Sequence, residues 1–169
     1  MKIIHVIGKV GAGKSHFITR VLSRKRQILQ KFDVKDVYRE TGHTPKELMD
    51  PTAMAQFSTA MEHKISAFVS AHRQMEGLFV VESSGMNKSI NRALMTFEHD
   101  VILVTSPFSS SPKIHRSRPY ATNLNMVFDR KMKRGEIRFD FQYVADKTGK
   151  GKFVDEVPDI LVKGGAMRC

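Results

Sequence analysis

Three glycines and a lysine follow directly behind a short apolar run near the start of the chain, in "KIIHVIGKVGAGKS". The stretch fits the pattern G-x-x-x-x-G-K-[ST], with Gly8, Gly13, Lys14 and Ser15 at the defining positions. Glycines let the backbone turn tightly with its amide groups pointing at a phosphate. The lysine can reach the β- and γ-phosphates of a nucleotide, and the serine hydroxyl can coordinate magnesium. The sequence therefore predicts a phosphate-binding loop.

The segments that flank this loop are those that a phosphate cradle needs. "KIIHVI" is short, apolar and β-branched, which predicts a buried strand, and apolar residues at helical spacing predict a helix from Lys14 to about Gln27. The positive N-terminal end of that helix would face the phosphate. The residues expected to contact the nucleotide are Gly8, Gly11, Ala12, Gly13, Lys14, Ser15 and His16.

A magnesium-bound nucleotide also needs a carboxylate, and Glu82 is the best candidate. It closes the apolar run "LFVV" and precedes "SSG", so it lies at the carboxyl end of a predicted strand. Open α/β sheets bind their ligands at that edge. We therefore expect Ser15 and Glu82 to be the metal-binding residues. The alternative for Glu82 is a surface glutamate at the end of a strand.

Two aspartates compete for a second role in the site. The segment "QKFDVKD" predicts a weaker strand that Asp36 ends, which puts this carboxylate near the phosphate-binding loop. There it could bind an acceptor hydroxyl or a magnesium-bound water, and Asp33 is its competitor. A solvated turn carboxylate is an equally good interpretation.

The segment after "DVILVTSP" is rich in basic residues. Eight lysines and arginines lie between Lys113 and Arg138, opposed only by Asp129 and Glu136. Mobile arginines can offset the negative charge that phosphoryl transfer spreads over the equatorial oxygens. A solvated position is the alternative for each arginine taken singly. The candidate arginines are Arg116, Arg118, Arg130, Arg134 and Arg138. Of these, Arg116 and Arg118 are the preferred catalytic residues.

The remaining segments alternate between helices and strands. A capping box at 44–47 starts a short helix, and Asp50-Pro51 starts a long amphipathic helix that ends near Arg73. "LFVVESSG", "DVILVTSP" and "DILVKGG" predict three further strands, apolar runs of the kind that parallel sheets bury on both faces. The alternation predicts one α/β domain over residues 1–169, with a parallel sheet and helices on both faces. Residues 108–154 are expected to form an insertion before the last strand, with a helix at about 123–134.

Composition limits the classes of partner and of location. The net charge of +11 predicts a polyanionic partner or substrate, with nucleic acid as one candidate. No apolar run approaches the roughly 20 residues of a membrane-spanning helix, and the N-terminus lacks the pattern of a signal peptide. The single cysteine, Cys169, cannot form an intramolecular disulfide. We expect a cytoplasmic protein without a membrane partner.

With these residues in view, the chain resembles P-loop NTPases, specifically the small nucleoside and nucleotide kinase-like group. The likeness rests on "GKVGAGKS", on Asp36 after the second strand, on "VVESSG" after a long helix and on "DVILVTSP" before the arginine-bearing insertion. The closing "DILVKGG" also looks like the final strand of these kinases. The resemblance implies a three-layer α/β/α sandwich with a five-stranded parallel sheet of order 2-3-1-4-5. It also implies a mobile lid over about 113–138.

The resemblance also implies roles for individual residues. Lys14 and Ser15 would serve phosphate and metal, Glu82 would be the Walker B-like acid, and Asp36 would bind the acceptor or act as base. The chain departs from the family in having no adenylate-kinase lid signature, no clear acceptor-site motif, and glutamate where many relatives have aspartate.

The leading hypothesis is ATP- and magnesium-dependent phosphoryl transfer to a small nucleotide, nucleoside or related metabolite, under a lid that excludes water. The alternatives are a nucleic-acid-associated NTPase, favoured by the basic clusters at 20–39 and 113–138, and a polynucleotide kinase. A GTP-binding switch is disfavoured, because "NKSI" and "VKDV" fail the [NT]-K-x-D pattern. The sequence leaves open the acceptor, the preferred base and the oligomeric state.

Overall fold

The computed structural model describes residues 1–42, 50–107, 121–146 and 150–162. Its centre is a six-stranded sheet of order β2-β3-β1-β4-β5-β6. The first five strands of that order are parallel, and β6 is antiparallel to β5. This confirms the predicted order 2-3-1-4 of the first four strands, whereas the fifth parallel strand is a different segment from the one predicted, and an antiparallel edge strand follows it. The strands are β1 (Lys2–Ile7), β2 (Ile28–Phe32), β3 (Leu78–Glu82), β4 (His99–Thr105), β5 (Phe141–Ala145) and β6 (Gly151–Val154).

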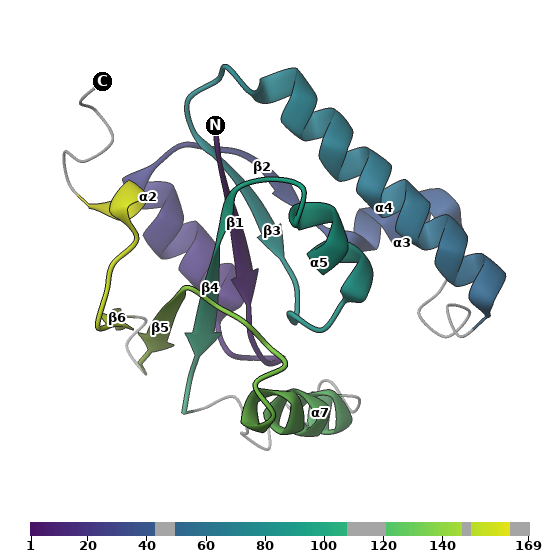
Figure 1. Ribbon diagram of the computed structural model, residues 1–169. Coiled ribbons are helices and arrows are strands. Elements are labelled where there is room, and N and C mark those ends of the chain that lie inside the picture. The colour runs from purple at the N-terminus through teal and green to yellow at the C-terminus, as the bar shows by residue number, and fades with distance from the viewer. Residues whose placement is uncertain (43–49, 108–120, 147–149, 163–169) are drawn as a thin grey trace.

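Helices cover both faces of the sheet, which gives the predicted three-layer α/β/α sandwich (Figure 1). One face carries the continuous helical segment of α1 (Lys14–Phe17), the π-helical turn η1 (Ile18–Leu22) and α2 (Ser23–Lys25). The other face carries α3 (Val34–Thr41), α4 (Pro51–His72) and α5 (Lys88–Leu94). Helix α7 (Ala121–Lys133) lies at the carboxyl end of the parallel strands, and η3 (Asp159–Leu161) is a short 3-10 helix.

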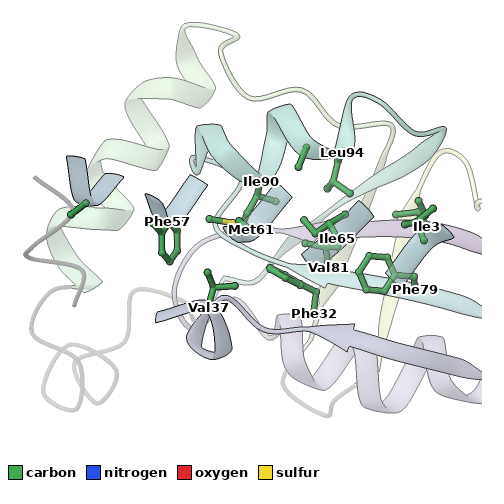
Figure 2. Close-up of a cluster of buried hydrophobic side chains, with 13 residues drawn as sticks. Ile3, Phe32, Val37, Phe57, Met61, Ile65, Phe79, Val81, Ile90 and Leu94 are labelled. Atoms are coloured by element: carbon green, nitrogen blue, oxygen red, sulfur yellow. The ribbon is translucent and has the colours of Figure 1, made fainter. Parts of the chain in front are cut away.

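Helix α4 begins where the sequence predicts and supplies most of one hydrophobic core. The Asp50 carboxylate accepts a hydrogen bond from the Ala53 amide at 3.0 Å, which caps the helix. The apolar stripe of α4 packs against α5 and the sheet (Figure 2), and each such side chain contributes about 2 kcal/mol when buried. Met54 also lies at the apolar spacing that makes this segment an amphipathic helix, but its side chain is 42% exposed. The buried stripe residues are Phe57, Met61, Ile65 and Val69.

A second core anchors the helical segment that follows the phosphate-binding loop. Phe17, Ile18 and Leu22 are almost fully buried against apolar residues of β1, β3, β4 and β5. The Phe17 ring lies 4.6 Å from that of Tyr143 in β5, measured between ring centroids. Because α1 is packed against the sheet in this way, the C-terminal end of the preceding loop is held in position.

The second strand ends earlier than the sequence pattern predicts. β2 stops at Phe32, and α3 begins at Val34, so Asp36 lies in the first turn of a helix rather than at the end of a strand. Val34, Val37 and Tyr38 recur at helical spacing, and Val37 is buried in the α4 core. This tertiary contact outweighs the strand pattern of residues 30–36.

The fifth parallel strand also lies elsewhere than predicted. The described part of "DILVKGG", residues 159–162, contains the 3-10 helix η3. The fifth strand is β5, which lies with β6 inside the predicted insertion of residues 108–154. Leu161 is buried beneath the helix after β1, so its apolar run completes a core without pairing as a strand. The predicted helix at 123–134 is confirmed as α7. The capping box at 44–47 and Cys169 lie outside the described residues. Among the described residues, no helix is both long and apolar enough to cross a membrane.

Candidate active site

The glycine-rich loop between β1 and α1 has backbone conformations that only glycine accepts readily. Gly8 has φ of 153°, and a Cβ atom there would lie 2.4 Å from the carbonyl oxygen of Val104 in β4. Gly13 has φ of 95° and immediately precedes α1. The two glycines of the motif are therefore fixed by a close backbone approach and by a left-handed turn.

Lys14 folds back over this loop. Its Nζ donates hydrogen bonds to the carbonyl oxygens of Gly8 and Lys9, both at 2.8 Å. The ammonium group is thereby held at the loop, where its positive charge can meet a phosphate oxygen.

Ser15 and Glu82 meet at the ends of neighbouring elements. The Ser15 Oγ donates to Glu82 Oε1 at 2.9 Å, and Glu82 Oε2 forms an ion pair with Lys31 Nζ at 2.5 Å. Glu82 ends β3 in register with Val6 of β1, which places its carboxylate beside the loop that follows β1. A hydroxyl and a carboxylate oxygen are hard donors of the kind magnesium prefers, so these two residues fit that ion. No group of three or more His, Cys, Asp or Glu side chains suited to a metal ion occurs among the described residues.

The loop, the end of β2 and the end of β3 together line one cleft of about 580 Å³. Lys14, Ser15, His16 and Glu82 all line it, as do Gly11 and Gly13, whereas Gly8 and Ala12 are not among the lining residues.

Asp33 is the aspartate that lines the cleft. Asp36 is not among the lining residues, and its carboxylate lies 3.7 Å from Arg39 on α3. The sequence pattern extended β2 by four residues and so placed Asp36 at the end of that strand, whereas Asp33 is the aspartate that follows it.

The arginine candidates are only partly described. Arg116 and Arg118 lie outside the described residues. Arg130, Arg134 and Arg138 are exposed, and none of these three lines the cleft. Arg138 instead lines a separate cavity together with His5 and His99.

Helix α7 contacts the phosphate-binding loop through two hydrogen bonds and an ion pair, which the sequence does not predict. Asn125 Oδ1 accepts a hydrogen bond from the Val10 amide at 2.9 Å, and Asn125 Nδ2 donates to the Val10 carbonyl at 3.3 Å. One turn later on α7, Asp129 pairs with Lys9 at 2.7 Å. Asn125 is buried, with 8% of its surface exposed. The sole sequence signal is the i, i+4 spacing of Asn125 and Asp129 on one helix face.

Removing the Asn125 amide should loosen the loop. We expect Asn125→Ala to weaken MgATP binding by up to about thirtyfold, because two hydrogen bonds at about 1 kcal/mol each hold Val10 in place. Isothermal titration with a non-hydrolysable ATP analogue measures the effect. Asn123→Ala, an exposed position on the same helix, is the matched control. If the two variants bound the ATP analogue equally well, the hydrogen bonds between Asn125 and Val10 would have no part in nucleotide binding.

His5 supports the segment that carries Glu82. Its Nε2 lies 2.6 Å from Ser83 Oγ, which also accepts a hydrogen bond from the Gly85 amide at 3.0 Å. Burial, with a smaller contribution from nearby His99, lowers the pKa of His5 from 6.5 to about 3. His5 is therefore neutral in the folded protein at ordinary pH.

This lowered pKa predicts an acid-dependent loss of stability. Between about pH 6.5 and 3 the unfolded chain binds a proton at His5 that the folded chain does not bind. The free energy of unfolding should therefore fall with falling pH, by up to about 1.4 kcal/mol per pH unit. Denaturant unfolding of the parent and of His5→Gln from pH 7 to 4 isolates this contribution, since other groups cancel in the difference. A difference that is independent of pH would contradict the assignment.

The strand order and the loop geometry together define the fold. A G-x-x-x-x-G-K-[ST] loop joins the central strand β1 to a helix, within a parallel sheet of order β2-β3-β1-β4-β5. This arrangement resembles the fold of P-loop NTPases.

Comparison with known proteins adds little beyond the fold. No protein-family model matches the chain, and no curated protein matches it in sequence. Among solved structures, shikimate kinase from Aquifex aeolicus is similar over 83% of this chain and 84% of its own, with 16% identity and a TM-score of 0.47. Shikimate kinase from Acinetobacter baumannii, solved with shikimate, shows 17% identity over 79% of both chains, with a TM-score of 0.47.

A protein of the PezAT toxin-antitoxin system from Streptococcus pneumoniae is also similar. It covers 89% of this chain and 70% of its own, with 13% identity and a TM-score of 0.45. At TM-scores below 0.5, these likenesses carry no inference about the activity of this chain, which is argued below from its own residues.

Proposed function

We propose that this protein transfers the γ-phosphate of ATP, with magnesium, to a small nucleotide, nucleoside or related metabolite. The observation that carries the proposal is the contact of Ser15 with Glu82 beside Lys14, at one end of a cleft that continues to Asp33. Groups suited to bind phosphate, metal and acceptor therefore line one continuous space.

The loop residues position and neutralise the donor. Backbone amides of the loop and the N-terminus of α1 would bind the phosphate chain. The Lys14 ammonium would donate to the β- and γ-phosphates and stabilise the charge that develops on the transferred group. Ser15 and Glu82 would hold magnesium, which would offset part of the negative charge of the phosphates when it is bound. Lys31, the ion-pair partner of Glu82, lies at the same wall of the cleft and adds a further cation.

The acceptor would occupy the part of the cleft between the ends of β2 and β3. Asp33 lines that part and would bind an acceptor hydroxyl and take its proton as the oxygen attacks phosphorus. The new O–P bond then forms as the bond between the γ-phosphorus and the bridging oxygen breaks, releasing ADP. A lid over 113–138, with Arg116 and Arg118 contributing positive charge, belongs to this proposal, as does a cytoplasmic location.

The proposal is tested by following ATP turnover with magnesium. Labelled product and free phosphate are measured in parallel across pools of nucleosides, nucleotides, coenzyme precursors and other small hydroxylated metabolites. We expect label on one acceptor class, with free phosphate a minor product. Free phosphate alone, with no labelled acceptor in any pool, would replace transfer by hydrolysis.

A further inference from the structure

A second, larger hollow lies on the outer face of the helical segment that follows the P-loop. It has a volume of about 730 Å³ and lies between this segment and the stretch from β6 to η3, which runs beside the helix (Figure 1). We call it the basic groove. Its basic or titratable lining residues include His16, Arg20, Arg24, Lys25 and Lys150.

No carboxylate lines this groove among the described residues. The acidic residues nearest in the chain, at 146, 155, 156 and 159, are not among those that line it, although the Asp146 carboxylate accepts a hydrogen bond from the backbone amide of Lys150 at 2.8 Å. Arg20 and Arg24 stand one helical turn apart, and both are exposed, as is Lys25. None of the three makes an ion pair with another described residue. Cations gathered in this way repel one another, and a polyanion relieves that repulsion.

The floor of the groove is aromatic and rigid. Phe153 of β6 is half-buried, and its ring packs edge-on against Tyr143 with centroids 5.2 Å apart. Phe153 also packs against Phe17, at 6.0 Å. A packed aromatic ring that lines the same groove as several cations suits a ligand that alternates charged and flat groups, as single-stranded nucleic acid does. An acidic polypeptide would use the cations and leave the aromatic floor unused.

The groove lies next to the cleft beside the glycine-rich loop. His16 lines both the groove and the P-loop cleft. We propose that the basic groove binds single-stranded nucleic acid, with phosphates on Arg20, Arg24 and Lys25 and a base against Phe153. This inference goes beyond phosphoryl transfer to a small acceptor.

The test is fluorescence anisotropy of a labelled 15-nucleotide single strand with the full chain and no ATP, over a series of salt concentrations. Arg24→Ala/Lys25→Ala should bind at least tenfold more weakly, and its log–log salt slope should be shallower by about 1.4, since each phosphate that is no longer neutralised accounts for about 0.7. Arg73→Ala/Lys88→Ala removes the same charge from exposed residues at the C-terminal end of α4 and on α5, and it should bind as the parent does.

A third variant separates stacking from charge. Phe153→Leu keeps an apolar floor and should bind several-fold more weakly with an unchanged salt slope. Unfolding curves of each variant show whether its fold is intact.

Three results would overturn the proposal. If both double variants bound the labelled oligonucleotide equally weakly, binding would depend on net charge and not on the basic groove. Equal affinity for poly-glutamate, insensitive to Phe153→Leu, would assign the groove to an acidic protein. The third result comes from a separate titration, in which ATP displaces the labelled oligonucleotide completely and Arg24→Ala/Lys25→Ala also binds ATP more weakly. These two observations together would assign the basic groove to the nucleotide site. Because binding is measured without ATP, a failure of the phosphoryl-transfer proposal leaves this test unaffected.

Discussion

Lys14→Ala should lower ATP turnover by roughly 10³-fold, the size of effect seen when a donor to a developing oxyanion is removed. In the structure the Lys14 ammonium is already held at the loop by two carbonyl oxygens. The phosphates therefore meet a positioned positive charge with little reorganisation. The measurement is the steady-state turnover number with saturating magnesium and ATP.

The control must separate catalysis from loop integrity, because the same ammonium binds the carbonyls of Gly8 and Lys9. Denaturant unfolding of Lys14→Ala shows whether the domain remains folded, and Lys88→Ala on α5 removes a lysine from an exposed position. Turnover of a folded Lys14→Ala protein within a few-fold of the parent would remove the P-loop from the mechanism.

Glu82→Gln should lower turnover about 10²-fold and raise the magnesium concentration required for half-maximal rate. The substitution keeps the shape and an oxygen that can accept from Ser15 Oγ, so the hydrogen bond at 2.9 Å can persist. It removes the negative charge that would bind the ion. Turnover across a magnesium titration gives both quantities.

Lys31→Gln is the matched control for this experiment, because it breaks the same ion pair and leaves the Glu82 carboxylate in place. If only the ion pair affects turnover, both variants will change the magnesium concentration required for half-maximal rate in the same direction. If the carboxylate binds magnesium, Lys31→Gln will keep or lower the magnesium requirement while Glu82→Gln raises it. A Glu82→Gln protein that matches the parent throughout the titration would move the metal-binding role to Asp33.

The parts of the fold and of the site that depend on neighbouring residues can be predicted from the sequence. The P-loop follows from the spacing of Gly8, Gly13 and Lys14, and the structure shows why these glycines are needed. The end of β3 at Glu82 follows from an apolar run closed by one acid, and α4 follows from its cap and its helical stripe. In each case neighbours within one or two turns of chain specify the conformation.

The contacts between distant residues across the site could not be predicted from the sequence. Asn125 reaches Val10 from 115 positions away, and Glu82 pairs with Lys31 from a neighbouring strand. Asp33 rather than Asp36 lines the cleft because packing of Val37 against α4 turns residues 34–41 into a helix. The fifth strand forms inside the predicted insertion because Tyr143 can pack on Phe17 there. Such choices depend on which distant side chains supply the buried surface, and no local pattern contains that information.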